Sequence, residues 1–279
     1  MKFGNSPNPL LLRIHLDAVE EIRTWNTHAA LQDPVASFLS NISLLRDYLV
    51  LPAVLLDYLT MMRLWDERAN LLFPLRDPRD PLCVSLRDKS LGDAASWVQE
   101  HFDDQAMLDE RLKQQEIHFN FLLQAERFRE SMRAFLLQSI VSAWSIFEMF
   151  TRECWERIER DFIRLSEKRK KPLRFNTLKS LRNSYSILLG DHKFILGVFD
   201  TEDLKELDAT RQLIVHRAGI VDKIFLQAAQ CDLPVGSPLQ VDAGKTSKLI
   251  NASIDCGKDF AHRLNICLNT ELSQNQTRP

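Results

Sequence analysis

Glycine is scarce in this sequence: only 8 of its 279 residues are glycine, about 3% against about 7% in an average protein. Sandwiches and barrels need glycine at many of their turns, so this scarcity disfavours them and favours a mostly helical fold. Hydrophobic residues make up 45% of the chain and charged residues 27%. This balance allows a sizeable buried core and excludes a disordered chain.

The sequence also lacks the residue pairs that mark metal, redox and phosphate-loop sites. Its five cysteines form no CxxC pair and have no histidine at a zinc-ligand interval. The segment Gly244-Lys245-Thr246 resembles the end of a phosphate-binding loop, but Leu239 stands where that loop needs its first glycine. No nucleophile elbow or dinucleotide fingerprint is present. We therefore expect free thiols in a reducing compartment, and neither a metal ion nor an organic cofactor.

Neither sign of charge is in large excess, and no apolar run is long. The 36 basic and 38 acidic residues leave a net charge of -2, which excludes a wholly basic nucleic-acid coat and requires any polyanion site to be local. The most apolar stretch, residues 48–56, falls short of the roughly 20 residues that span a bilayer. Residues 10–12 are too few for a signal-peptide core. We expect a soluble cytoplasmic protein with no membrane partner.

Apolar residues recur at helical spacing along most of the chain. The pattern predicts helices over residues 10–31, 35–73, 173–189, 201–217 and 246–272, with two or three more between residues 93 and 171. Pro34 is expected to start the second helix, and Pro52 to break or kink it, because proline removes a helix hydrogen bond. The hydroxyl of Thr201 is expected to cap the helix that follows it. The proline-rich residues 73–81 predict a loop, and residues 231–245 an irregular segment that allows a small hairpin.

The first candidate site lies on the helix that follows Thr201. Five residues share one face of that helix: Leu204, Leu207, Arg211, Ile214 and Ala218. A buried arginine needs a carboxylate, a carbonyl or a phosphate as its partner. His216 lies five positions after Arg211, about 140° round an ideal helix, and Arg217 adds a positive charge beside it. Spacing alone favours a structural ion pair and a helix-terminal histidine.

A stripe of polar residues lies upstream of this helix and interrupts the apolar segment 135–155: Gln138, Ser142, Ser145, Glu148 and Arg152. Glu148 can pair with Arg211 or orient His216, while a solvated carboxylate or a salt bridge to Arg152 explains it equally well.

The second candidate is a basic stretch. Residues 152–182 hold eleven basic and five acidic residues, a local net charge of about +6. The residues best suited to contact RNA there are Lys168, Arg169, Lys170, Lys171 and Arg174. Such a patch can hold a phosphate backbone without reading its sequence. A solvated helix end explains residues 168–171 equally well.

Residues 204–222, with Arg211 and His216, resemble the signature helix of the HEPN superfamily, whose motif is an arginine, four to six residues and a histidine. Residues 142–150 resemble the first long helix of that domain, which often carries an acidic residue that faces the motif. The resemblance covers roughly residues 127–272. It implies an all-helical protein in which a HEPN-type bundle, residues 121–279, follows an N-terminal helical region, residues 1–120.

The resemblance also implies a metal-independent endoribonuclease of the toxin and phage-defence type. In this chemistry a ribose 2'-hydroxyl attacks the adjacent phosphate and leaves a 2',3'-cyclic phosphate and a 5'-hydroxyl. His216 would transfer protons, Arg211 would stabilise the charge on the phosphate, and Glu148, Gln212 and Arg217 would support them. A homodimer that places two copies of this groove face to face would supply both an acid and a base. The implied partners are RNA and an antitoxin or other defence-system protein.

One residue departs from the family pattern. Many active members carry asparagine, aspartate or histidine directly after the motif arginine, whereas this chain carries Gln212. This departure favours an alternative, a non-catalytic HEPN-like module that binds RNA, a nucleotide or a partner protein. A third interpretation is a helical scaffold in which Arg211 satisfies an internal carboxylate.

Overall fold

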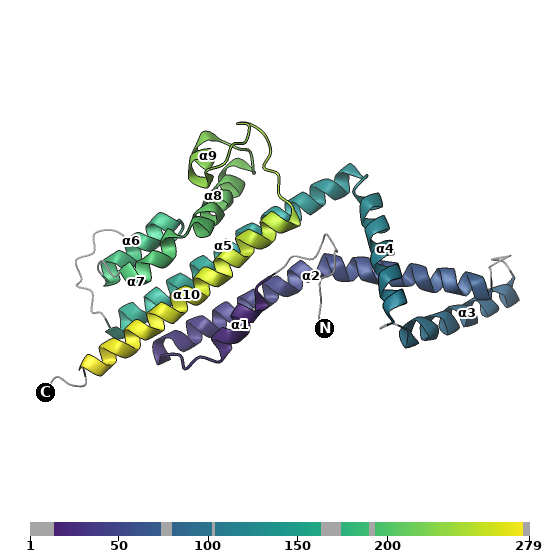
Figure 1. Ribbon diagram of the computed structural model, residues 1–279, viewed down its shortest axis with the longest axis horizontal. Coiled ribbons are helices and arrows are strands. Elements are labelled where there is room, and N and C mark those ends of the chain that lie inside the picture. Colours follow the sequence, from purple (N-terminus) through teal and green to yellow (C-terminus); the bar gives the residue numbers. More distant parts are fainter. Residues whose placement is uncertain (1–13, 74–79, 102–103, 163–173, 190–192, 276–279) are drawn as a thin grey trace. The chain divides into compact units, whose positions relative to one another are not determined.

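The structure, a computed structural model, describes residues 14–73, 80–101, 104–162, 174–189 and 193–275, and these are almost entirely helical (Figure 1). The helices are α1 (Leu16–Arg23), α2 (Ala29–Leu72), α3 (Pro81–Glu100), α4 (Gln105–Leu122), α5 (Glu126–Phe162), α6 (Leu178–Leu189), α7 (Lys193–Leu196), the 3-10 helix η1 (Gly197–Asp200), α8 (Glu202–Arg217), α9 (Lys223–Ala229) and α10 (Ala243–Asn275). Within these ranges the only β pairing is an isolated antiparallel bridge between Ile220 and Pro238. The prediction of an all-helical fold is confirmed.

The chain folds into two compact units that do not follow a single cut along the sequence. Among the described residues, the larger unit combines those up to residue 49 with those from residue 133 onward, and the smaller unit holds those from residue 50 to residue 132. The sequence predicted one boundary, after residue 120. The observed division differs from it, because α1 and the first part of α2 belong to the larger unit. Their apolar side chains, among them Ile22 and Phe38, are buried in its core. Burial there removes large apolar surfaces from water.

Aromatic side chains from four elements form the centre of the larger unit. Phe260 of α10 lies with its ring centroid 5.0 Å from that of Tyr185 on α6, 5.5 Å from Phe199 on η1 and 6.1 Å from Phe150 on α5. All four side chains are at most 1% exposed. The Tyr185 hydroxyl donates a hydrogen bond to the carbonyl of Thr151, which satisfies the one polar atom of this cluster.

Helices α2 and α10 approach one another closely at Gly257. A β-carbon at this position would lie 2.5 Å from Cζ of Phe38, well inside van der Waals contact. The Phe38 ring is 1% exposed and stacks on Phe150 with 4.4 Å between centroids, so it has no room to withdraw. Only glycine fits at this crossing.

The smaller unit is held by small apolar clusters and by two buried arginines. Met61 of α2, Val98 of α3 and Met107 of α4 form one apolar cluster. The guanidinium of Arg111 on α4 donates to Asp57 of α2 at 2.8 Å, and Arg87 of α3 pairs with Asp66 of α2. A buried guanidinium needs such a partner.

Two expectations about helix ends are wrong. Helix α2 begins at Ala29 instead of Pro34, and of the break or kink expected at Pro52 the break is absent, because the helix continues through that residue. Each proline removes one backbone hydrogen bond, but buried apolar residues on both sides of it, including Leu31 and Phe38 around Pro34, stabilise the continuous helix. Thr201 does stand at the N-terminal cap of α8, yet its hydroxyl makes no cap bond and instead contacts the carbonyl of Val198 at 3.4 Å.

Helices α2 and α5 are both long and apolar enough to cross a membrane when judged by length and composition alone. Half of the apolar window of α5 is buried inside the protein, as in the core helix of a soluble protein, but only 22% of the α2 window is buried. Such a test is weak evidence for a membrane protein. It nevertheless identifies α2 as a helix with an unusually exposed apolar surface.

Candidate functional site

Helix α8 presents the motif histidine because of how the helix ends. Leu207 and Leu213 are buried and anchor the helix, which packs against α9 and α10. Ala218 adopts a left-handed conformation with φ of 51°, and Gly219 follows with φ of 75°. The amide of Gly219 then donates to the carbonyl of Leu213 at 3.1 Å, a left-handed helix stop. The chain reverses there, which leaves His216 exposed in the last turn.

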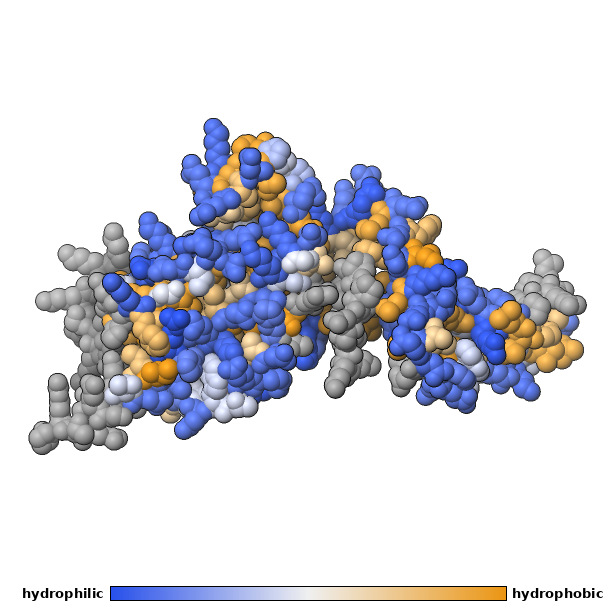
Figure 2. Space-filling view, viewed as in Figure 1, coloured by the Kyte–Doolittle hydropathy of each residue, from blue (hydrophilic) through white to orange (hydrophobic). Residues whose placement is uncertain are grey.

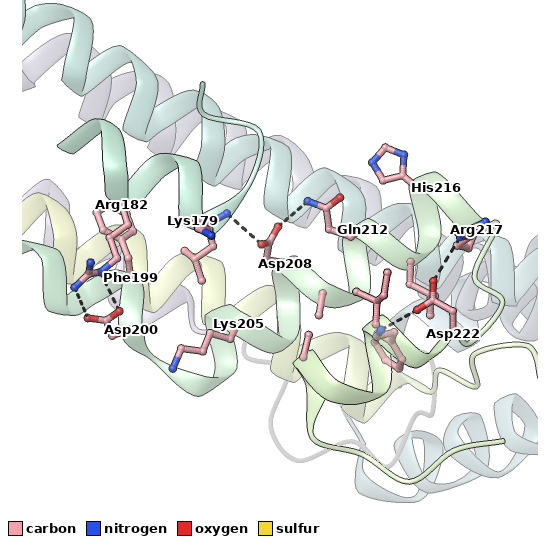
Figure 3. A pocket seen from close by; sticks show the side chains of 16 residues that line it. Lys179, Arg182, Phe199, Asp200, Lys205, Asp208, Gln212, His216, Arg217 and Asp222 are labelled. Atoms are coloured by element: carbon pink, nitrogen blue, oxygen red, sulfur yellow. Dashed lines mark hydrogen bonds and ion pairs between the residues drawn. The ribbon is translucent and has the colours of Figure 1, made fainter. Parts of the chain in front are cut away.

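A cavity of about 660 Å³ lies beside α8 (Figure 3). It is lined by residues of α6, η1, α8 and α9 and by Asp222: Leu178, Lys179, Arg182, Phe199, Asp200, Lys205, Asp208, Ala209, Gln212, Leu213, His216, Arg217, Asp222, Ile224, Phe225 and Ala228. Most of the lining surface is apolar, and hydrophobic side chains also gather over α9 in Figure 2. The cavity therefore combines an apolar interior with charged groups contributed by several elements.

One end of the cavity carries His216 and Arg217. The Arg217 Nε lies 3.5 Å from Oδ2 of Asp222, and Asp222 also caps α9 by accepting a hydrogen bond from the amide of Phe225 at 2.8 Å. His216 is exposed, and no hydrogen bond or ion pair joins it to any described residue. Its imidazole is therefore available to an incoming ligand, with a cation one residue away.

The middle of the cavity is held by Asp208. Its carboxylate accepts hydrogen bonds from the backbone amide of Leu178 at 3.1 Å and from the side chain of Gln212 at 3.3 Å. It thereby joins α8 to the first residue of α6, where free amides and the helix dipole favour negative charge. Burial nevertheless raises the pKa of Asp208, against the lowering effect of Leu178, Gln212 and the nearby Arg211.

Because the pKa of Asp208 is raised, the folded protein binds this proton more tightly than the unfolded chain does. Stability therefore falls as the pH rises from near 3.8, the ordinary value, through the higher folded pKa. Asp208→Asn keeps an acceptor for the Leu178 amide and removes the buried charge, so we expect its stability at neutral pH to match or exceed that of wild type. Thermal unfolding from about pH 4 to pH 7 checks this.

Asp208→Ala provides the matched control, because it removes the charge and the acceptor together. It is expected to cost about 1 kcal/mol through the unpaired amide at the start of α6. If the asparagine variant loses as much stability at neutral pH as the alanine variant, ionised Asp208 contributes more than a hydrogen-bond acceptor and this account of it is wrong.

The other end of the cavity carries cations that the RNA-contact prediction does not include. Arg182 pairs with Asp200 at 3.1 Å and Lys205 pairs with Glu202 at 2.8 Å. Lys179 is exposed and has no hydrogen-bond or ion-pair partner in the described part of the chain. Sequence reasoning did not predict this cavity. The pattern that points to it is the spacing of Asp208 and Gln212, which lie four residues apart and therefore on one face of α8.

Arg211 does not share the cavity with His216. Its Nη1 donates to the backbone carbonyl of Asn176, just before α6, at 3.3 Å. Its Nε is buried with no hydrogen-bond partner among the described residues. The side chain is half-buried, its acceptor is a carbonyl, and no carboxylate pairs with it in the described ranges. Within one chain, therefore, the two motif residues point to different sides of α8.

The remaining predicted site residues either lie apart from the motif or fall outside the residues that the structure describes. Glu148 accepts a hydrogen bond from the indole of Trp144 at 3.0 Å, and nothing in the described ranges joins it to Arg211 or His216. Arg152 pairs with Glu156 instead. Arg174 is exposed. Lys168, Arg169, Lys170 and Lys171 lie outside the residues that the structure describes.

No group of three or more histidine, cysteine, aspartate or glutamate side chains in the described ranges could hold a metal ion. Comparison of the chain with protein-family models, with curated proteins and with solved structures finds no match. The HEPN resemblance therefore rests on the sequence motif and its helical context.

Proposed function

We propose that this protein is a cytoplasmic, metal-independent endoribonuclease of the HEPN type, which cleaves RNA by attack of a ribose 2'-hydroxyl on the adjacent phosphate. One observation carries the proposal. His216 is exposed, has no partner among the described side chains, and lines a cavity that also bears Lys179, Arg182 and Arg217. An imidazole can both accept and donate a proton, and beside cations that attract phosphate it suits proton transfer at a phosphodiester.

The cations of the cavity would hold the RNA backbone. Lys179 is available as it stands, whereas Arg182, Lys205 and Arg217 are paired with carboxylates at the protein surface. Exposed ion pairs of this kind contribute little to stability, about 0–1 kcal/mol. A phosphate can therefore replace the carboxylate at low cost.

Transfer of two protons requires a second histidine. The reaction removes a proton from the 2'-hydroxyl and delivers one to the leaving 5'-oxygen, and each chain supplies one histidine in this site. A dimer that brings two α8 helices together would place the two His216 side chains in one composite cleft. In that cleft the half-buried Arg211 would exchange the carbonyl of Asn176 for the charged phosphate, a stronger acceptor.

A ribonuclease that acts on cellular RNA needs a means of control. The proposal therefore includes a partner protein, an antitoxin or another defence component, that covers the cavity when the enzyme is inactive. Burying the exposed His216 and Ile224, which is 73% exposed on α9, would both block the site and remove apolar surface from water.

Incubation of the purified full chain with total cellular RNA in EDTA tests the proposal. We expect cleavage that continues in the chelator and leaves 2',3'-cyclic phosphate and 5'-hydroxyl ends. A matched oligonucleotide with every 2'-hydroxyl methylated should resist cleavage, because it lacks the nucleophile. Cleavage of the methylated RNA, or products with 5'-phosphate ends, would contradict the mechanism.

A specific feature favours a second function, the binding of a nucleotide without catalysis. The lining of the 660 Å³ cavity is mostly apolar, its size is that of small-ligand sites, and Arg211 lies outside it. An apolar interior suits a base, and Lys179 and Arg182 suit its phosphates. A rise in melting temperature with nucleotides, combined with no RNA cleavage by the same preparation, would favour this function over the nuclease.

A further inference from the structure

The part of α2 that belongs to the smaller unit has two contrasting faces. One face is packed: Ala53 and Leu56 are buried and lie against Phe119 and Leu122 at the end of α4. Thr60 continues this buried face. The helix segment is therefore held on one side by its own unit, which fixes the direction in which the opposite side points.

The opposite face is apolar and uncovered. Its six large side chains are each 44–57% exposed: Leu51, Val54, Leu55, Tyr58, Leu59 and Met62. The one charged residue between Tyr48 and Met62 is Asp57, and its carboxylate accepts hydrogen bonds from Arg111 and Gln115 of the smaller unit. No charge therefore interrupts the apolar face.

The spacing of these residues is that of a helix that pairs with another helix. Leu51, Leu55, Tyr58 and Met62 follow one another at intervals of four, three and four residues, the pattern of the core positions of a coiled coil. Val54 and Leu59 flank this seam and widen it.

The exposed apolar area is large for an uncovered surface. Six large side chains that each expose about half of their surface present on the order of 600 Å², given about 150–250 Å² for a whole large side chain. Monomeric proteins rarely expose a contiguous apolar patch larger than a few hundred Å². Two such faces in contact would bury roughly 1,200 Å², which reaches the lower bound for specific stable interfaces.

A membrane is a poorer match for this face than a second helix. The charged residues Asp47 and Arg63 bracket only 15 residues, and a membrane-spanning helix needs about 20. Within those 15 residues the packed side of the helix carries the Asp57 carboxylate, which would be costly in hydrocarbon. Heptad spacing, in contrast, serves contact with another helix and is not required for contact with lipid.

We infer that a second copy of this chain covers the face, with the α2 seam of one copy packed along the α2 seam of the other. A two-fold contact of this kind uses the same patch on both copies. It lies on the smaller unit and does not involve α8, so it is separate from the contact that the proposed nuclease cleft requires.

The mass of the full chain in solution tests the inference. We expect the double variant Leu55→Glu, Tyr58→Glu to halve the assembly mass measured by sedimentation equilibrium, because two pairs of like charges would enter the seam. The far-UV circular dichroism should stay unchanged, since both side chains are about half exposed. Leu82→Glu is the matched control: Leu82 is 66% exposed in the same unit but outside the seam. Equal masses for wild type and double variant would overturn the inference.

Photo-cross-linking identifies the contact directly and does not depend on a destabilising change. The variant Tyr58→p-benzoylphenylalanine is prepared as an equal mixture of ¹⁴N-labelled and ¹⁵N-labelled chains. We expect cross-linked peptides that combine both labels and map to residues 51–62 of each chain. Cross-linked products that never combine the two labels, as links to residues 1–13 of the same chain would give, or capture by lipid vesicles in place of a second chain, would contradict it. Loss of RNA cleavage without loss of this cross-link would count against the proposed function alone.

Discussion

His216→Ala is expected to lower the rate of RNA cleavage by about 10³-fold, within the range of about 10²–10⁴-fold that general acid–base catalysis contributes. The proposed site has one imidazole per chain, and the methyl group of alanine can neither accept nor deliver a proton. Because His216 is exposed and makes no hydrogen bond or ion pair to the described residues, its removal should leave the fold intact. The loss should therefore appear in the rate and not in the melting temperature.

Single-turnover cleavage of a defined RNA, compared for wild type and variant at equal concentration, measures this effect. His262→Ala is the matched control, because His262 is also exposed and belongs to the same unit, where its ring lies 5.3 Å from that of Trp25. We expect the control to cleave at nearly the wild-type rate. If His216→Ala cleaves as fast as the control, His216 is not part of the mechanism.

Phe260→Ala is expected to lower the free energy of unfolding by about 3–5 kcal/mol, the usual cost of removing a buried aromatic ring. Phe260 is fully buried, and its ring contacts Phe150, Tyr185 and Phe199 from three different elements. The rigid helices around it cannot close the space that the ring leaves, so the loss of apolar burial and the cavity both contribute. This is a large part of the total stability of a typical domain, about 5–15 kcal/mol.

Urea unfolding followed by near-UV circular dichroism measures this change, since Trp144 and Trp155, buried in the same core, contribute to that signal. Ile187→Ala is the control: Ile187 of α6 is 58% exposed, and its truncation should change the free energy by about 0.5 kcal/mol or less. A loss at Phe260 no larger than that at Ile187 would mean that the aromatic cluster does not hold the larger unit together.

Local patterns were sufficient for most of the secondary structure. Helix α8 runs from residue 202 to residue 217, against a predicted range of 201–217, and residues 231–242 are irregular as predicted. Pro238 in that segment forms an isolated antiparallel bridge with Ile220, which lies before α9. These features depend on interactions between residues a few positions apart, such as apolar spacing, helix stops and turn residues. The scarcity of glycine also predicted the all-helical class, because sandwiches and barrels need glycine at many of their turns.

Long-range packing determined what the local patterns left open. Pro34 predicted a helix start and Pro52 a break or kink, but the burial of neighbouring apolar residues outweighs the lost hydrogen bonds and keeps α2 continuous from Ala29 to Leu72. The sequence left the partner of Glu148 open among Arg211, His216, Arg152 and solvent, and the structure gives its carboxylate a hydrogen bond from the indole of Trp144, one turn earlier.

The sequence by itself determined the helical class, the position of α8, and the placement of Arg211 and His216 five residues apart on one helix. Only the tertiary structure decided which neighbours each side chain meets: the carbonyl of Asn176 for Arg211, and the cavity with its cations for His216. The physical reason is that helical periodicity fixes the direction of a side chain relative to its own helix axis. What lies in that direction depends on segments brought together from distant parts of the chain, as α6 is to α8 through Asp208.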